Sequence, residues 1–336
     1  MKVSIIIPVY NVSRYIERCL NSVAAQIYPD IECILVDDCS QDHSVEIIYA
    51  YLATYAGNVD FKVFRLAQNR GPSFVRNIGL EHASGEYVYF LDSDDEITVD
   101  CINNLVALVE KYEDVDLVQG NTLIVGSAKE NERLAYMDIS KLQLPEYSNN
   151  HLWIKKSLLT IIPDTAWSKL VRRKILLEYN IRFKEGVIHE DIHWRFFLSK
   201  YVQTMAISKT PTYKYCVNEN SIMMNPDRTR SYADILTVVE DCLRNVDPVL
   251  KNVQLTSLLR HLLSRRIRAR VDLANLKAYN KVYSQFVDRI LNSNANLFTK
   301  LCVIYLKLPS AVLKQSLFLR FFGFWMRTYD RFGPKG

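Results

Sequence analysis

The chain has 336 residues, 49% of them hydrophobic and 24% charged, a balance that excludes a disordered protein and suits one core domain with an extension. Its seven cysteines are scattered without a Cys-x-x-Cys pair, which argues against a disulfide framework or a zinc site and favours a reduced cytosolic protein. The net charge of +5 hides an asymmetry, because residues 251–336 carry 16 basic against 3 acidic side chains and residues 1–250 are net negative.

The first hundred residues alternate strand-like and helix-like patterns. Residues 3–9 form a short β-branched run broken by Pro8, too short for a signal peptide. Strand, helix, strand, helix at this spacing predicts a parallel sheet built from right-handed crossovers, and therefore an α/β fold. Strands are predicted at residues 4–9, 31–36, 61–66 and 86–91, and helices at 13–26, with Ser13 as its cap, 45–55 and 72–83.

The second part of the chain is less regular. A strand is predicted at 115–119, followed by a polar, irregular excursion over 123–150. Residues 201–208 and 210–217 are expected to pair as two short strands. Asp247-Pro248 is a plausible hinge into the basic tail. Further helices are predicted at 153–162, 174–179, 193–200 and 232–246.

The strand at 86–91 ends directly in Asp92, Ser93, Asp94 and Asp95. Three carboxylates in four residues repel one another unless water, backbone N–H groups or a cation neutralises them. Mg²⁺ and Mn²⁺ take few protein carboxylates and complete their shell with phosphate oxygens, so this loop suits a metal–diphosphate. The alternative is a turn in which Asp92 or Asp94 caps a helix that starts near Thr98.

A second acidic pair, Asp37-Asp38, ends the strand at 31–36. In parallel sheets ligands bind outside the carboxyl ends of the strands, so one crevice is expected to hold both acidic segments. No Gly-x-Gly-x-x-Gly follows the first strand, which argues against a dinucleotide enzyme, and there is no Gly-Lys-Ser/Thr loop.

Four segments in this order resemble the family 2 glycosyltransferases, whose fold, called GT-A, is that of the nucleotide-diphospho-sugar transferases. They are Ser-Ile-Ile-Ile-Pro-Val-Tyr-Asn at 4–11, Leu-Val-Asp-Asp-Cys-Ser-Gln-Asp at 35–42, Asn-Arg-Gly-Pro-Ser-Phe-Val-Arg-Asn-Ile-Gly-Leu at 69–80, and the acidic stretch at 85–95. The resemblance implies a mostly parallel central sheet flanked by helices. Over residues 1–225 it implies a GT-A domain, with a nucleotide-sugar half at 1–120 and an acceptor half at 121–225.

The resemblance also implies roles on the donor side. Pro8, Val9, Tyr10 and Asn11 would line the nucleotide, with the Tyr10 ring on the base; otherwise Tyr10 is the last core residue of a strand. Asp38 would accept the uracil N–H, or else it caps a turn with Ser40 and Asp42.

Next to the diphosphate, the resemblance places an arginine and the metal ligands. Arg76 would lie near the diphosphate, or else it forms a plain surface ion pair. Asp94 matches the main ligand of Mn²⁺ or Mg²⁺, with Asp92 as a second ligand and Ser93 between them. Asp95 is assigned to loop structure.

On the acceptor side, Glu190-Asp191 resembles the family's Glu-Asp pair before a helix, which implies Asp191 as the general base and Glu190 as a possible acceptor contact. The alternative is an acidic helix N-terminus. His189 and His193 are a weak zinc signal. Trp167, in a segment shared with this branch, either stacks on a sugar or is an ordinary buried tryptophan. Tyr213-x-Tyr215 and Asn218 match a downstream pattern of the family without an evident role.

The basic tail, residues 226–336, is predicted to be a separate helical extension. From Leu297 to Met326 nearly every residue that is not basic is apolar, and no uncharged run is long enough to span a bilayer. This apolar content favours helices in the membrane interface rather than nucleic-acid binding, and Lys300, Lys307 and Lys314 would share one stripe of such a helix. The alternative is a helical subdomain that packs on the catalytic domain or on a second copy in a homodimer.

Together these patterns predict a metal-dependent inverting glycosyltransferase at the cytoplasmic face of the membrane. Its donor is expected to be a UDP-sugar and its acceptor a lipid-linked glycan, as in capsule or exopolysaccharide assembly. A sugar nucleotidyltransferase and a catalytically inactive membrane-bound interaction subunit are the alternatives.

Overall fold

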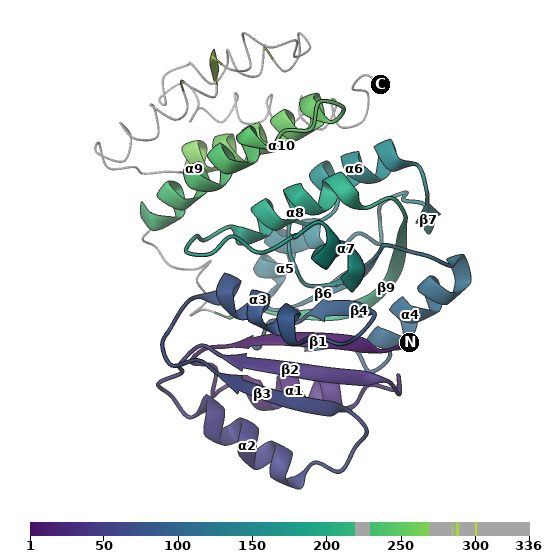
Figure 1. Cartoon of the computed structure of the whole chain (residues 1–336), viewed down its shortest axis with the longest axis vertical. Helices are drawn as coiled ribbons and strands as arrows, with labels where there is room; N and C mark the ends of the chain where they lie inside the picture. Colours follow the sequence, from purple (N-terminus) through teal and green to yellow (C-terminus); the bar gives the residue numbers. More distant parts are fainter. Residues whose placement is uncertain (219–228, 269–283, 285–286, 289–299, 301–336) are drawn as a thin grey trace. The chain divides into compact units, whose positions relative to one another are not determined.

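The computed structural model describes residues 1–218, 229–268, 284, 287–288 and 300 (Figure 1). The chain divides into two compact units, one of Met1–Gly186 with Glu190–Asn225 and one of Val187–His189 with Pro226–Gly336. The predicted division at residues 225 and 226 remains a proposal, and the short segment Val187–His189 belongs with the second unit. The predicted interfacial stretch from Leu297 to Met326 lies outside the described residues, apart from Lys300.

The first unit is built on one nine-stranded sheet of the described residues, with strands in the order β3-β2-β1-β4-β8-β6-β9-β5 and β7 beside β9. Strands β3, β2, β1 and β4 are parallel, as predicted. Strand β8 runs antiparallel to both β4 and β6, and β9 runs parallel to β6. The strands are β1 (Val3–Val9), β2 (Ile31–Asp37), β3 (Asp60–Arg65), β4 (Tyr87–Phe90), β5 (Glu96–Ile97), β6 (Leu117–Val125), β7 (Tyr147–Ser148), β8 (Lys169–Arg172) and β9 (Met205–Cys216).

Helices cover both faces of this sheet (Figure 1). Strand β1 sends alternate side chains to the two faces, with Ile5 and Ile7 in one core and Ile6 in the other, because side chains alternate along a strand. The first core includes α1 and α4, and the second includes α3, α6, α7 and α8. The helices are α1 (Ile16–Ala24), α2 (Ser44–Thr54), α3 (Pro72–His82), α4 (Cys101–Tyr112), α5 (Ala128–Leu134), η1 (Ala135–Met137), α6 (His151–Thr160), α7 (Arg173–Glu178), α8 (Glu190–Tyr201), α9 (Thr229–Arg244) and α10 (Lys251–Arg268).

Three local expectations are wrong. Ser13 does not cap the first helix, which begins at Ile16 without a side-chain cap; the Ser13 N–H instead donates to Asp42 Oδ2 at 2.9 Å. The excursion over 123–150 contains the end of β6, the capped helix α5 and strand β7. The two strands predicted at 201–208 and 210–217 are one strand, β9, because shifts in its register against β6 accommodate the polar stretch around Pro211.

In the second unit, α9 and α10 pack together through apolar side chains such as Val239, Cys242 and Leu255. The Ile188 N–H donates to Asp234 Oδ2 on α9 at 2.8 Å, which joins the short segment Val187–His189 to this unit. No helix within the described ranges is both long and apolar enough to cross a membrane.

Candidate active site

The donor-side residues gather where β2, β1 and β4 end, because these three strands are parallel neighbours in the sheet. The Asp38 N–H donates to Val9 O at 2.8 Å, and the Asn11 N–H donates to Ser40 Oγ at 3.1 Å. The sheet therefore brings the loop at 8–11 against the loop at 38–42.

Tyr10 is 46% exposed and follows the last residue of β1, so it is not a core residue of the strand. Asn11 has a φ of 52°, a left-handed conformation that asparagine tolerates better than most residues. Its Oδ1 accepts the Gln41 N–H at 2.8 Å, which stabilises the turn. The exposed Tyr10 ring is thus presented at the strand edge, where a flat base could lie on it.

Asp38 is buried, and its carboxylate accepts the backbone N–H groups of Arg70 at 2.6 Å and Gly71 at 2.8 Å. It does not cap a turn with Ser40 and Asp42; the Ser40 N–H is accepted by Asp37 instead. Burial raises the pKa of Asp38, against the lowering effect of the two N–H donors. Its contact with a uracil ring remains a prediction.

Arg76 links the two halves of the predicted site. It is buried on α3, and its Nη2 donates to Asp92 Oδ1 at 2.7 Å while its Nη1 donates to Glu190 Oε1 at 2.8 Å. Burial alone would lower the pKa of Arg76, but Asp92 and Glu190 hold it above its usual range. The surface-pair alternative is therefore wrong, and one guanidinium joins the acidic loop to the start of α8.

The acidic loop does not cap a helix. Helix α4 begins at Cys101, and Asp94 Oδ2 instead accepts an N–H of Asn218 at 3.3 Å. Ser93 is buried between the two aspartates. Asp95 is buried as well, and its two oxygens accept the Tyr213 hydroxyl at 2.6 Å and the Cys216 N–H at 2.7 Å, in agreement with its assignment to loop structure.

Two carboxylates of this loop suit a divalent cation. Asp92 and Asp94 each have one oxygen in a hydrogen bond, which leaves the second oxygen of each carboxylate outside these bonds. Burial, and then Asp92, raise the pKa of Asp94, and a cation would relieve both effects. Across the described part of the chain no group of three or more His, Cys, Asp and Glu side chains is arranged for a metal. Mg²⁺ bound with a diphosphate nevertheless usually takes only one or two carboxylate ligands from the protein.

Asp191 is the second residue of α8. It is half-buried, and its Oδ1 is enclosed without a hydrogen-bond partner among the described residues. Burial raises the pKa of Asp191 well above its ordinary range; Glu190 and Asp92 raise it further, whereas Arg76 and Lys169 lower it. Such an enclosed carboxylate next to mixed charges is a candidate proton acceptor.

Trp167 is 4% exposed and stacks on Tyr213, with ring centroids 4.3 Å apart, and on Tyr215 at 5.7 Å. This geometry is that of a buried core tryptophan, so the sugar contact proposed for Trp167 remains a prediction without support from its burial. Glu190 is buried and held by Arg76, which makes it a partner of that arginine rather than a residue open to an acceptor.

The sequence patterns missed the roles of three residues. Tyr213 and Asn218, near the end of β9, bond the acidic loop, although their motif was visible without a role. The Arg18 guanidinium on α1 donates to Asp94 O and lies 3.9 Å from Glu96, and no motif marks it. These residues hold the loop from segments up to 124 positions away.

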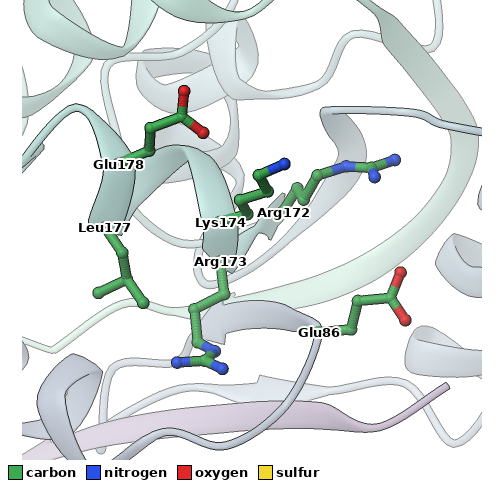
Figure 2. Close-up of a pocket in the computed structure, with 6 residues that line it drawn as sticks. All are labelled: Glu86, Arg172, Arg173, Lys174, Leu177 and Glu178. Carbon is green, nitrogen blue, oxygen red and sulfur yellow. The ribbon is translucent and has the colours of Figure 1, made fainter.

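A cavity of about 620 Å³ lies away from this site, at the start of β4 and the beginning of α7 (Figure 2). Figure 2 shows Glu86, Arg172 and Arg173 around it. Arg172 is engaged with Asp114 at 2.7 Å, and Arg173 Nε donates to Gly85 O at 2.6 Å. Glu86 precedes β4 whereas Asp92 follows it. The cavity therefore lies at the amino-terminal end of β4, and the acidic loop lies at its carboxyl end.

Comparison with solved structures defines the fold class. The crystal structure of TarS residues 1–349 from Staphylococcus aureus with UDP-GlcNAc has a TM-score of 0.72 at 22% identity and covers 94% of this chain and 88% of that one. The mannosyltransferase PcManGT from Pyrobaculum calidifontis, with GDP-Man and Mn²⁺, has a TM-score of 0.58 at 17% identity and covers 98% and 84%. The fold is therefore GT-A, as predicted.

The sequence model of glycosyl transferase family 2 matches residues 4–178, so the chain belongs to this family. Glycosyltransferase GlyA of Streptococcus pneumoniae is 33% identical over 197 residues, 56% of this chain and 27% of GlyA. The poly(ribitol-phosphate) β-N-acetylglucosaminyltransferase TarS of S. aureus is 31% identical over 188 residues, 55% of this chain and 30% of TarS. The aligned part is thus less than a third of either relative.

Proposed function

We propose that the chain is an inverting, metal-dependent glycosyltransferase that moves a sugar from a UDP-sugar to a hydroxyl of a glycan acceptor. The carrying observation is the pair of Arg76 bonds, 2.7 Å to Asp92 and 2.8 Å to Glu190. These bonds join the acidic loop to the start of α8, which supports a single site for donor and acceptor, as a reaction between two bound substrates requires.

On the donor side, Pro8, Val9, Tyr10 and Asn11 line the nucleotide and Asp38 recognises uracil. Exposure of Tyr10 at the strand edge supports this assignment. Asp38 already accepts two backbone N–H groups, yet a carboxylate has about four acceptor positions and can take a further N–H. TarS, a relative by sequence and fold, has been crystallised with UDP-GlcNAc, which favours a UDP-linked donor here.

Asp94 and Asp92 would hold Mn²⁺ or Mg²⁺ together with the donor diphosphate. The paired carboxylates and the raised pKa of Asp94, caused by burial and by Asp92, support a cation at this loop. When bound, the ion offsets negative charge on the departing diphosphate. Arg76 supplies a fixed positive charge next to Asp92 and needs no rearrangement to do so.

Asp191 takes the proton from the acceptor hydroxyl. The oxygen of that hydroxyl then attacks the anomeric carbon from the side opposite the diphosphate, which inverts the configuration. The enclosed Oδ1 and the raised pKa of Asp191, caused mainly by burial, support a carboxylate that accepts a proton more readily than an exposed aspartate.

The acceptor is proposed to be a lipid-linked glycan of cell-surface polysaccharide assembly, reached from the cytoplasmic face of the membrane. The basic, apolar composition of residues 297–336 supports a peripheral membrane contact. Comparing the full chain with a chain lacking 297–336 in sedimentation with anionic vesicles tests this part. We expect the deletion to abolish vesicle binding and to leave nucleotide binding intact; unchanged vesicle binding would contradict the membrane proposal.

The test of the activity is UDP release from a panel of UDP-hexoses and UDP-N-acetylhexosamines, with lipid-linked oligosaccharides as acceptor and with Mn²⁺ or EDTA. We expect metal-dependent release with one donor, and a product whose anomeric proton coupling shows the opposite configuration. Retention of configuration would contradict the mechanism. No turnover with any donor would favour the inactive interaction subunit.

A further inference from the structure

Asp94, the predicted main ligand of the cation, is bonded by an amide that has no role in the proposed function. Its Oδ2 accepts an N–H of Asn218, which follows β9, at 3.3 Å. The other end of the same amide is engaged as well, because Asn218 Oδ1 accepts the Tyr15 hydroxyl at 3.0 Å. Two hydrogen bonds in series therefore connect Tyr15, directly before α1, to the Asp94 carboxylate.

The two bonds favour one orientation of the Asn218 amide. If the amide were turned over, its oxygen would face the Asp94 carboxylate, and two acceptors with no hydrogen between them repel each other. In the orientation found, the Tyr15 hydroxyl donates to the amide oxygen, and hydrogen bonds in such a chain polarise and strengthen one another. Tyr15 therefore both fixes and strengthens the donor that Asp94 accepts.

The backbone of Asp94 is held from the same region of the chain. The Arg18 guanidinium donates to Asp94 O, and its central carbon lies 5.1 Å from the centroid of the Tyr15 ring. Tyr15 and Arg18 are three positions apart, so they are neighbours at the start of α1. The start of α1 thus contacts Asp94 directly through Arg18 and indirectly through Asn218.

Tyr15 is also bonded to the segment predicted to line the nucleotide, but through its backbone. Its N–H donates to Val12 O at 2.8 Å, and the Val12 N–H donates to Ser44 Oγ at 2.8 Å. Val12 directly follows Asn11, the last residue assigned to the nucleotide. Because these bonds do not involve the Tyr15 hydroxyl, Tyr15→Phe removes the bond to Asn218 and leaves the backbone bonds in place.

We propose that Tyr15 and Asn218 are positioning residues for the predicted cation: they hold Asp94 Oδ2, so that the carboxylate presents its other oxygen to Mn²⁺ or Mg²⁺ in one orientation. This inference rests on the proposed metal at Asp94. Carboxylates that bind metals are commonly held by hydrogen bonds of this kind, and loss of such a partner typically lowers metal affinity by about 10–100-fold. Tyr15 is one bond further from the carboxylate, so its hydroxyl should matter less than Asn218.

Calorimetric titration of the full chain with UDP in Mn²⁺ tests the inference without turnover. We expect Asn218→Ala to weaken UDP binding by about 10–100-fold, because the metal carries the diphosphate. We expect Tyr15→Phe to weaken it by about threefold to tenfold, the effect of one hydrogen bond. Since the two bonds act in series, Tyr15→Phe should have no further effect in the Asn218→Ala background. Additive losses would overturn the inference.

Two matched variants lose the same kinds of bond elsewhere. Tyr28→Phe removes a half-buried hydroxyl that donates to Met1 O at 2.5 Å, before the beginnings of β1 and β2. Asn104→Ala removes an amide that donates to Asp100 Oδ2 at 2.8 Å, at the start of α4. We expect both controls to bind UDP in Mn²⁺ as the wild type does. Equal losses in the controls would show general destabilisation and overturn the inference.

Uridine separates positioning of the metal ligand from support of the nucleotide loop. Uridine lacks the diphosphate, so its binding needs no metal, and it is followed by saturation-transfer NMR in EDTA. We expect Tyr15→Phe and Asn218→Ala to bind uridine as the wild type does; a loss in parallel with UDP would overturn the inference. If wild-type UDP binding is the same in EDTA, the proposed metal fails and the inference with it. Metal-dependent binding that neither variant changes overturns the inference alone.

Discussion

The two sides of the site are built in different ways. On the donor side, the loops after β1, β2 and β4 are placed by parallel neighbouring strands, and backbone groups supply many of the bonds, such as those to Asp38. On the side predicted for the acceptor, the start of α8 is held by side chains from remote segments: Arg76 of α3 bonds Glu190, and Arg195 of α8 bonds Asp164. The side predicted for the donor is thus built from local motifs, whereas the start of α8, next to the predicted base, is held by buried charges.

The largest effect should come from Asp191→Asn. We expect kcat to fall by about 10²–10⁴-fold, because the amide cannot accept the proton, while the UDP-sugar affinity stays nearly unchanged. Turnover and calorimetric binding are measured on the same preparation. A parallel loss of nucleotide binding would show that Asp191 belongs to the donor side and would erase the distinction between the two sides.

Asp94→Ala, unlike Asp191→Asn, should weaken nucleotide binding. We expect it to remove the metal-dependent part of UDP binding, because one of two carboxylates for the cation is lost. Asp60→Ala serves as the matched control, since Asp60 is exposed at the beginning of β3, away from the acidic loop. If the two variants bind UDP equally in Mn²⁺, the assignment of Asp94 as the main ligand is wrong.

The sequence predicts the donor side better than the acceptor side. Asp92 and Asp94 follow a strand. The carboxyl ends of neighbouring parallel strands lie side by side, so the position of these two residues was predictable. The burial of Trp167 against Tyr213 depends on β8, β6 and β9 being neighbours, an order that local patterns do not contain. The burial of Lys169 was missed for the same reason, because it depends on β8 lying between β4 and β6 in the sheet.

Arg76→Lys tests the connection between the sides. A single ammonium cannot reproduce the two guanidinium bonds to Asp92 and Glu190, so one buried carboxylate is left without its partner. We expect a loss of about 3–5 kcal/mol in unfolding free energy at most, with a loss of turnover of about 10–100-fold. Arg173→Lys, at the opposite edge of the sheet, should change turnover little; equal effects would contradict the link.

Tyr213→Phe should have the smallest effect. It removes the hydroxyl that donates to Asp95 and accepts the Asp92 N–H, at a cost of about 1–3 kcal/mol in stability. We expect weaker Mn²⁺-dependent UDP binding without a change in pH profile, measured by calorimetry and chemical unfolding. The exposed Tyr179→Phe is the control. A shifted pH profile would place Tyr213 on the acceptor side instead.

The most direct test is calorimetric titration of the full chain with UDP and with GDP, each in Mn²⁺ and in EDTA. The proposed donor site predicts UDP binding at about micromolar affinity that requires the metal and exceeds GDP binding. Metal-independent binding, preference for GDP, or binding of neither nucleotide would contradict a UDP-sugar site at Asp38, Asp92 and Asp94.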